Sequence, residues 1–157
     1  MNKSADSANV RFPPPLIYLG FLVAGIVIGR ALALPGFGLG STVATAFGWG
    51  LVLVGLVVNF SSAGMFRRSG TAIIPFKPAS RLVTSGIYRW TRNPMYLGMA
   101  LLYAGIAVLF ESILALILLT VVIAIIDSQV IAREEAYLGR QFGDEYRAYK
   151  ARVRRWI

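Results

Sequence analysis

The chain has 157 residues, of which 57% are apolar, and a formal net charge of +9 at pH 7. It contains neither cysteine nor histidine, which excludes disulfides, thiolate nucleophiles, imidazole bases and the commonest zinc ligands. The basic residues alternate in blocks with long apolar runs, a pattern typical of a membrane protein rather than a soluble nucleic-acid-binding domain. We therefore expect a single all-α, membrane-embedded domain over residues 1–157, with no metal and no nucleic-acid partner.

Two apolar segments in the first half predict membrane-spanning helices, which follow an exposed polar tail over residues 1–15. The first covers 16–34, contains only Arg30 as a charge, and is long enough to cross about 30 Å of hydrocarbon. A cleaved signal peptide is the alternative, because residues 31–33 resemble a cleavage site, but Arg30 and the length of the run favour a retained span. The second segment, 43–65, carries small residues that allow helices to approach closely.

A basic, irregular segment over 67–92 then leads into the stretch S-G-I-Y-R-W-T-R-N-P-M-Y-L-G, residues 85–98. Asn93 suits the N-cap of a helix, and Pro94 suits the first turn, where its missing N–H costs nothing. The start of this helix should present unpaired N–H groups and the positive end of the helix dipole. Such a place attracts an anionic group.

Residues 95–110 and 112–126 predict a tight hairpin of two short membrane helices that turns at Glu111. Each arm of about fifteen residues reaches roughly 22 Å, which is short for a bilayer and requires tilt or local thinning. The last two spans would therefore bring the chain back beside residues 92–96. The sequence predicts four spans in total.

The remaining residues, 127–157, form a charged segment that predicts amphipathic helices, with a break at Gly143. With four spans, both termini lie on one side together with fifteen of the sixteen Lys and Arg residues. The positive-inside rule places that side in the cytosol. We expect an integral protein of a prokaryotic inner membrane, with its basic surface against membrane lipids.

Two cytosolic pieces carry polar side chains that membrane anchoring does not explain: the loop with Arg92, Asn93 and Tyr96, and the segment with Glu134 and Glu135. A carboxylate in the apolar stripe that includes Glu135 either pairs with a cation or binds a ligand. S-adenosylmethionine fits such a site through its carboxylate, ammonium, ribose and adenine groups. From the residues alone, a nucleotide fits as well.

The second half of the sequence contains four features in a fixed order: R-N-P-M-Y-L-G (92–98), an apolar hairpin, E-E-A-Y-L-G-R-Q-F-G-D-E-Y-R-A-Y (134–149) and a final V-R-R-W-I. Together they resemble the isoprenylcysteine carboxyl methyltransferase family, within the phospholipid methyltransferase superfamily. The resemblance covers Pro75 to the end of the sequence. It implies an all-helical membrane enzyme that uses S-adenosylmethionine to methylate a lipidic acceptor at the cytosolic face.

The resemblance also implies site residues. Glu135 and Arg92 are the expected catalytic residues, and the expected cofactor-binding residues are Asn93, Pro94, Tyr96, Gly98, Glu134 and Glu135. Asn93 stands where many members carry histidine. Two alternatives stay open: a phospholipid amine as the acceptor, whose proton Glu134, Glu135, a tyrosine or water must accept, and a non-catalytic membrane protein that binds lipid or a partner.

Overall fold

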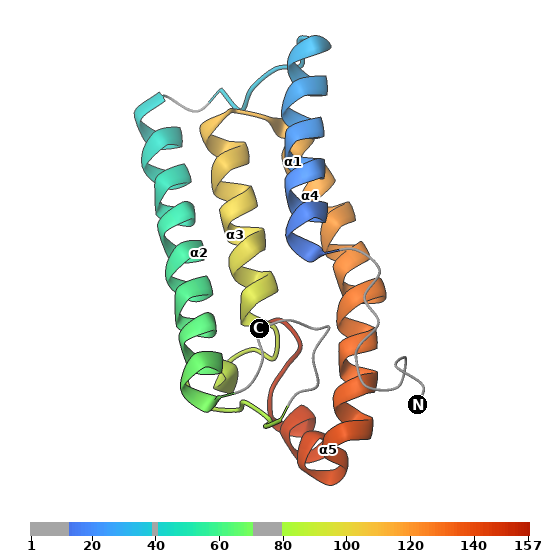
Figure 1. Ribbon diagram of the computed structural model, residues 1–157. Coiled ribbons are helices and arrows are strands. Elements are labelled where there is room, and N and C mark those ends of the chain that lie inside the picture. The colour runs from blue at the N-terminus through green and yellow to red at the C-terminus, as the bar shows by residue number, and fades with distance from the viewer. Residues whose placement is uncertain (1–12, 39–40, 71–79) are drawn as a thin grey trace.

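The computed structural model describes residues 13–38, 41–70 and 80–157 of the chain, and every regular element within these ranges is helical (Figure 1). The longer elements are α1 (Pro14–Ala31), α2 (Ser41–Ser69), α3 (Pro94–Leu109), α4 (Ile113–Ile125) and α5 (Ala132–Arg152). A short 3₁₀ helix, η1 (Gly86–Arg89), precedes α3, and a π-helical turn, η2 (Ile126–Ile131), joins α4 to α5 without a break. The predicted all-helical class is confirmed.

Three helices are long and apolar enough to cross a membrane: α1, α2 and the continuous helix that starts at Ile113. The fourth apolar helix, α3, has only 16 residues and falls short of a simple span. In Figure 1, α3 lies between α2 and the α1–α4 pair. The four-span count therefore stays a prediction, since it depends on how the bilayer meets the short helix.

Paired glycines bring α2 and α3 together. A Cβ atom on Gly55 would lie 2.8 Å from the carbonyl oxygen of Gly98, and one on Gly105 would lie 2.7 Å from that of Gly48. The two backbones therefore touch near both ends of the shared interface, a packing mode common between membrane helices. The expected role of small residues in the second span is confirmed at Gly48 and Gly55.

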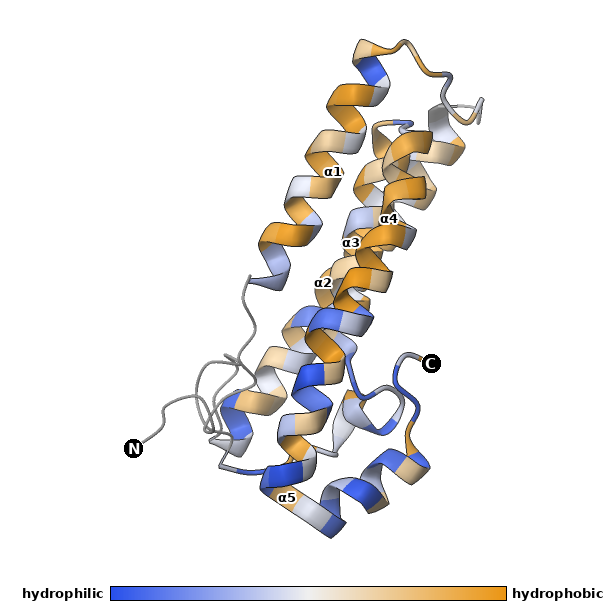
Figure 2. Ribbon diagram, turned by 90° about the vertical axis from the view of Figure 1, so that its right-hand side faces the viewer, coloured by the Kyte–Doolittle hydropathy of each residue, from blue (hydrophilic) through white to orange (hydrophobic). Residues whose placement is uncertain are grey.

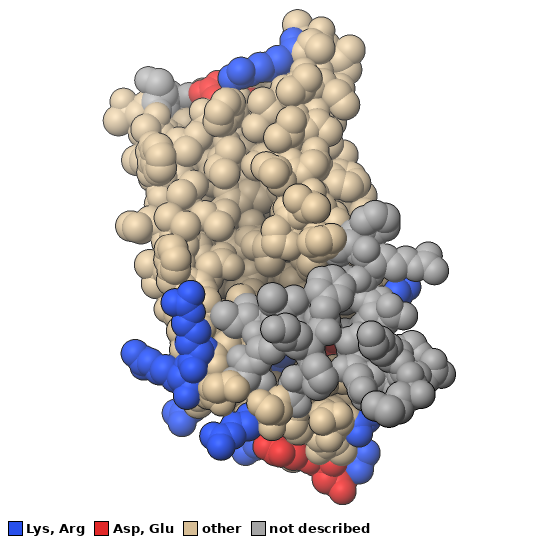
Figure 3. Space-filling model, in the orientation of Figure 1, with Lys and Arg blue, Asp and Glu red and all other residues tan. Residues whose placement is uncertain are grey.

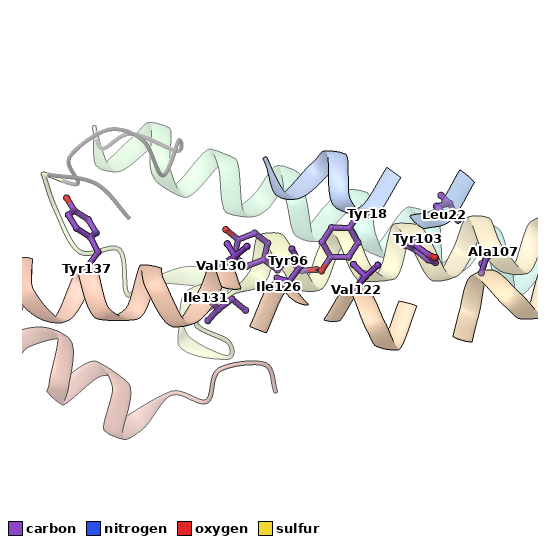
Figure 4. Close-up of a cluster of buried hydrophobic side chains, with 12 residues drawn as sticks. Tyr18, Leu22, Tyr96, Tyr103, Ala107, Val122, Ile126, Val130, Ile131 and Tyr137 are labelled. Atoms are coloured by element: carbon purple, nitrogen blue, oxygen red, sulfur yellow. The ribbon is translucent and has the colours of Figure 1, made fainter. Parts of the chain in front are cut away.

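Helix α1 packs against the hairpin. The Ser112 hydroxyl caps α4 by accepting from the N–H of Ala115 at 3.2 Å and donates to the carbonyl oxygen of Gly25 at 3.2 Å. At the other end of α1, the Tyr18 hydroxyl donates to the carbonyl oxygen of Tyr96 at 3.1 Å. The core is a cluster of buried apolar and tyrosine side chains from α1, α3, α4, η2 and α5 (Figure 4).

The helical shaft is apolar, and the polar residues gather at its ends (Figure 2). In the space-filling view, most Lys and Arg side chains in sight lie at the end that carries α5, and a smaller charged group lies at the hairpin end (Figure 3). Arg30 belongs to that smaller group, where its guanidinium lies 5.1 Å from the centre of the Phe110 ring. Large apolar side chains of α1 and α2, such as Val27 and Phe47, are exposed along the shaft.

Several predicted boundaries differ from those in the structure, among them the end of α1, which lies at Ala31 rather than at residue 34. Helix α1 already begins at Pro14, which is buried as the first helical residue rather than part of an exposed tail. Helix α2 continues to Ser69, beyond the expected residue 65. Helix α5 ends at Arg152, and the carbonyl oxygens of Arg154 and Arg155 accept from residues 91–93 instead, so the predicted helical tail is five residues too long.

Gly143 interrupts α5 with a φ of 51° and a ψ of −119°, a left-handed conformation that only glycine adopts easily. The break expected at this position is therefore present. Whether the segment on either side of it lies on a lipid surface stays a prediction. The expectations for residues 1–12 of the tail and 71–79 of the central segment lie outside the described residues.

Candidate functional site

The Asn-Pro loop, residues 91–94, enters α3 with Asn93 at the N-cap position and Pro94 in the first turn. The position is as predicted, but the Asn93 side chain does not cap the helix. Its Nδ2 instead donates to the carbonyl oxygen of Arg155 at 2.9 Å, while its backbone N–H donates to Thr91 Oγ1 at 3.1 Å. Asn93 therefore ties the loop to a segment 62 residues later in the chain.

Helix α5 brings the two predicted glutamates to this loop. The Tyr96 hydroxyl donates to Glu134 Oε1 at 2.6 Å, and Arg92 Nη2 lies 3.0 Å from Glu135 Oε1. The hairpin returns the chain as the sequence analysis requires, so residues some forty positions apart share one site. The structure thus assembles Arg92, Asn93, Tyr96, Glu134 and Glu135 at the end of the bundle that carries most of the charge.

Glu135 is 8% exposed and surrounded by cations. Besides Arg92, it accepts from Nε and Nη2 of Arg155 at 3.0 and 2.8 Å, and from Lys150 Nζ at 3.2 Å. Burial acts to raise its pKa, but the hydrogen bonds from Arg155 and Lys150 and the charge of Arg92 outweigh burial and lower the pKa below its usual value. Of the two possibilities for this carboxylate, the structure contains the ion-paired one.

Glu134 has a different environment, although it is the neighbouring residue. Burial raises its pKa to about 7, and the hydrogen bond from Tyr96 offsets only part of that rise. Its carboxyl group therefore binds a proton far more readily near neutral pH than an ordinary glutamate does. Two adjacent carboxylates with pKa values moved in opposite directions are typical of functional sites.

Among the described residues, Arg92 has the largest number of buried side-chain donors without a hydrogen-bond partner. Its side chain is 8% exposed, yet Nε and Nη1 are buried and form no hydrogen bond with the described part of the chain. Only Nη2 has an ionic partner, Glu135. Buried guanidinium N–H groups without an acceptor are costly. Nε and Nη1 point away from each other on the two sides of Cδ, so each offers a separate charged donor to a ligand.

The structure gives Gly98 a packing role. A Cβ atom at this position would lie 2.3 Å from Asn59 Nδ2 and 3.0 Å from the Gly55 carbonyl oxygen of α2. Gly98 therefore faces α2, whereas Tyr96 faces Glu134 on α5. Pro94 is buried as the first residue of α3 and sets the start of the helix.

Several residues at the site were missed from the sequence. Arg155 Nη1 lies 2.8 Å from Asp127 Oδ2, and Trp156 Nε1 donates to Asp127 Oδ1 at 2.9 Å. The Tyr149 hydroxyl donates to the carbonyl oxygen of Tyr88 at 2.7 Å, which ties α5 to η1. The V-R-R-W-I motif was the available signal, but its spacing was interpreted as the face of a lipid-bound helix.

Similar proteins were found by sequence comparison. A family model described as phospholipid methyltransferase matches residues 43–145, more than half of the chain. A protein-S-isoprenylcysteine O-methyltransferase of Schizosaccharomyces pombe is 39% identical over 72 residues, which are 46% of this chain and 30% of that protein. The enzyme of the same name from Saccharomyces cerevisiae is 31% identical over 119 residues, 74% of this chain and 50% of its own length.

An uncharacterized protein of Haemophilus influenzae is 43% identical over 63 residues, 40% of this chain and its own full length. The chain spans half or less of the two yeast methyltransferases described above. No solved structure matches the chain significantly. The family match includes both the Asn-Pro loop and the two glutamates that the structure brings together. The chain therefore belongs to the phospholipid methyltransferase family.

Proposed function

We propose that the chain is an S-adenosylmethionine-dependent methyltransferase that acts on a lipid-linked acceptor at the cytosolic face of a membrane. The observation that carries this proposal is the contact between the Asn-Pro loop and the paired glutamates at the polar end of an apolar bundle. Family membership supports methyl transfer, and the names of the relatives support an acceptor with an apolar part.

The chemistry of the donor set fits the cofactor. The unpaired Nε and Nη1 of Arg92 each offer a single charged donor for an oxygen of the cofactor's carboxylate. Glu134 and Glu135 offer acceptors for its ammonium group or ribose hydroxyls, provided that Glu135 gives up one of its present cations. S-adenosylmethionine, when bound, supplies a methyl group on a sulfonium for in-line transfer, a reaction that depends mainly on positioning of the two reactants.

The residues of the chain would then bind the cofactor and orient it toward the acceptor. Arg92 and Glu135 fix the charged end of the cofactor, and Tyr96 holds the Glu134 carboxylate by its 2.6 Å hydrogen bond. The apolar shaft, with exposed side chains such as Val27 and Phe47, lets the tail of the acceptor remain in the bilayer. The concentration of positive charge at the α5 end supports its assignment to the cytosol.

A phospholipid amine is the second candidate acceptor, and one observation favours it. An amine must lose a proton before it accepts a methyl group, and Glu134, whose pKa is raised to about 7 by burial, can take that proton near neutral pH. A carboxylate acceptor needs no base. The two acceptors therefore differ in their dependence on Glu134.

The first experiment is calorimetric titration of the detergent-purified chain with S-adenosylhomocysteine. We expect binding to wild type, at least tenfold weaker binding to Glu135→Gln, and a measurable loss in Asn93→Ala. Labelled S-adenosylmethionine offered with phosphatidylethanolamine or with a prenylcysteine analogue then identifies the acceptor. Folded wild-type protein that binds no S-adenosylhomocysteine would favour the non-catalytic alternative and overturn the proposal.

A further inference from the structure

Residues Arg154, Arg155 and Trp156, here named the clasp, connect three separate parts of the site. Their backbone carbonyls receive the loop: the N–H of Arg92 donates to the carbonyl oxygen of Arg154 at 3.0 Å. Thr91 Oγ1 and Asn93 Nδ2 both donate to the carbonyl oxygen of Arg155, at 3.1 and 2.9 Å. Three donors of the Asn-Pro loop are thus satisfied by two carbonyls of the clasp.

The side chain of Arg155 then reaches two carboxylates. Its Nε and Nη2 bind both oxygens of Glu135, at 3.0 and 2.8 Å, and its Nη1 binds Asp127 Oδ2 at 2.8 Å. All three guanidinium nitrogens therefore have acidic partners. A lysine cannot make this arrangement, because its ammonium group lacks the planar fork that bridges two carboxylates.

Asp127 holds the clasp from the opposite side. One of its oxygens accepts from Arg155 and the other from Trp156 Nε1 at 2.9 Å, so a single carboxylate fixes two consecutive side chains. Asp127 lies in the π-helical turn η2, where the extra residue per turn changes the direction in which side chains leave the helix. The walls of this turn, Ile126, Val130 and Ile131, are buried in the core.

We infer that Asp127 and Arg155 are positioning residues of the cofactor site, which act through Glu135 and the Asn-Pro loop. The inference rests on the proposed function for the identity of the ligand, but not for the clasp itself. The ionic partners of Glu135 are Arg92 from the loop, Lys150 from the part of α5 beyond the Gly143 break, and Arg155 from the clasp. Among the described residues, Arg155 is the one of these three cations that a second carboxylate, Asp127, also holds.

The test compares two conservative variants, Asp127→Asn and Arg155→Lys, with a matched pair of variants at an exposed ion pair on α5. The exposed pair Asp144–Arg147 supplies the controls Asp144→Asn and Arg147→Lys. In calorimetry with S-adenosylhomocysteine, we expect at least tenfold weaker binding for the clasp variants and less than a twofold change for the controls. In the Glu135→Gln background, Asp127→Asn should cause a smaller further loss than in wild type, because the part of its effect that passes through Glu135 is already gone.

A second measurement needs no ligand. Hydrogen exchange at the amides of Arg92 and Asn93 should accelerate at least tenfold in Arg155→Lys and Asp127→Asn, and should remain at the wild-type rate in both controls. If wild type does not bind S-adenosylhomocysteine, the proposed function is wrong. The hydrogen-exchange rates then still test whether the clasp positions the loop. Wild-type exchange rates in the clasp variants, or an Asp127→Asn effect that persists in full without Glu135, would overturn the inference.

Discussion

At the hairpin end of the bundle, polar contacts are few and tie the turn to its neighbouring helices, whereas at the Asn-Pro end they join segments far apart in the chain. Ser112 caps its own helix and reaches Gly25 of α1. At the Asn-Pro end, the loop, η2, α5 and the clasp converge on Glu135 and Asp127. The hairpin end needs only to turn the chain, while the Asn-Pro end holds buried charges that demand partners.

The largest expected difference between the ends follows from removal of a carboxylate. Glu135→Gln leaves Arg92 buried without its counter-ion, which should lower the free energy of unfolding by about 3 kcal/mol. Glu111→Gln, in the exposed turn of the hairpin, should change it little. Unfolding of both variants in detergent with increasing denaturant measures the difference. Equal losses at the two ends would contradict the comparison.

The glycine contacts between α2 and α3 should separate stability from binding. Gly98→Ala and Gly105→Ala each force a methyl group against α2 and should destabilise by about 1–3 kcal/mol. Only Gly98→Ala, half a turn from Tyr96, should also weaken S-adenosylhomocysteine binding. Gly50→Ala, whose Cβ meets nothing within 4 Å, is the control for both measurements. A binding loss in Gly105→Ala as large as in Gly98→Ala would show that the two ends are not independent.

The raised pKa of Glu134, at the Asn-Pro end, should make the free energy of unfolding depend on pH. Its folded-state pKa of about 7 lies above the unfolded value, so its contribution to stability is present below about pH 4.5 and is lost as pH rises through 7. The loss should be on the order of 1–2 kcal/mol, after allowance for its partial exposure. Unfolding midpoints of wild type and Glu134→Gln between pH 5 and 8 test this. Parallel curves for the two proteins would exclude a raised pKa.

The smallest expected effect lies at the hairpin end. Ser112→Ala removes the cap of α4 and the bond to Gly25, which should cost about 1 kcal/mol of stability. Binding of S-adenosylhomocysteine should not change. Thr120→Ala, which removes an exposed hydroxyl that bonds only within α4, should have a smaller effect on thermal unfolding. A change in cofactor affinity in Ser112→Ala would mean that the hairpin turn is coupled to the site.

Much of the fold followed from the sequence because it depends on local patterns. Apolar runs indicated the helices, Glu111 indicated the turn, and the returning hairpin predicted the contact of residues 92–96 with Glu134 and Glu135. Small residues in the second span indicated the close approach to α3. The roles proposed for the site residues themselves stay predictions.

The clasp could not be predicted in this way. Apolar and aromatic residues recur at helical spacing after Gly143, so the pattern favours a helix that continues to residue 157. These residues are Tyr146, Tyr149, Val153 and Trp156. In the structure, α5 stops at Arg152, and the carbonyl oxygens of Arg154 and Arg155 accept instead from the Asn-Pro loop, more than sixty residues away. The same non-local bonds explain why Asn93 occupies an N-cap position without capping. The π-helical turn η2 could not be predicted either, because the apolar residues around it continue at ordinary helical spacing.

The carbonyl oxygen of Arg155, shared by Thr91 and Asn93, has a consequence for biosynthesis. A ribosome makes Thr91 and Asn93 more than sixty residues before it makes Arg155, so the loop is synthesised without its acceptor. The loop can therefore form these bonds only after all of α5 has been made. Nascent chains that stop short of Arg155 would lack the carbonyl oxygen that Thr91 and Asn93 share.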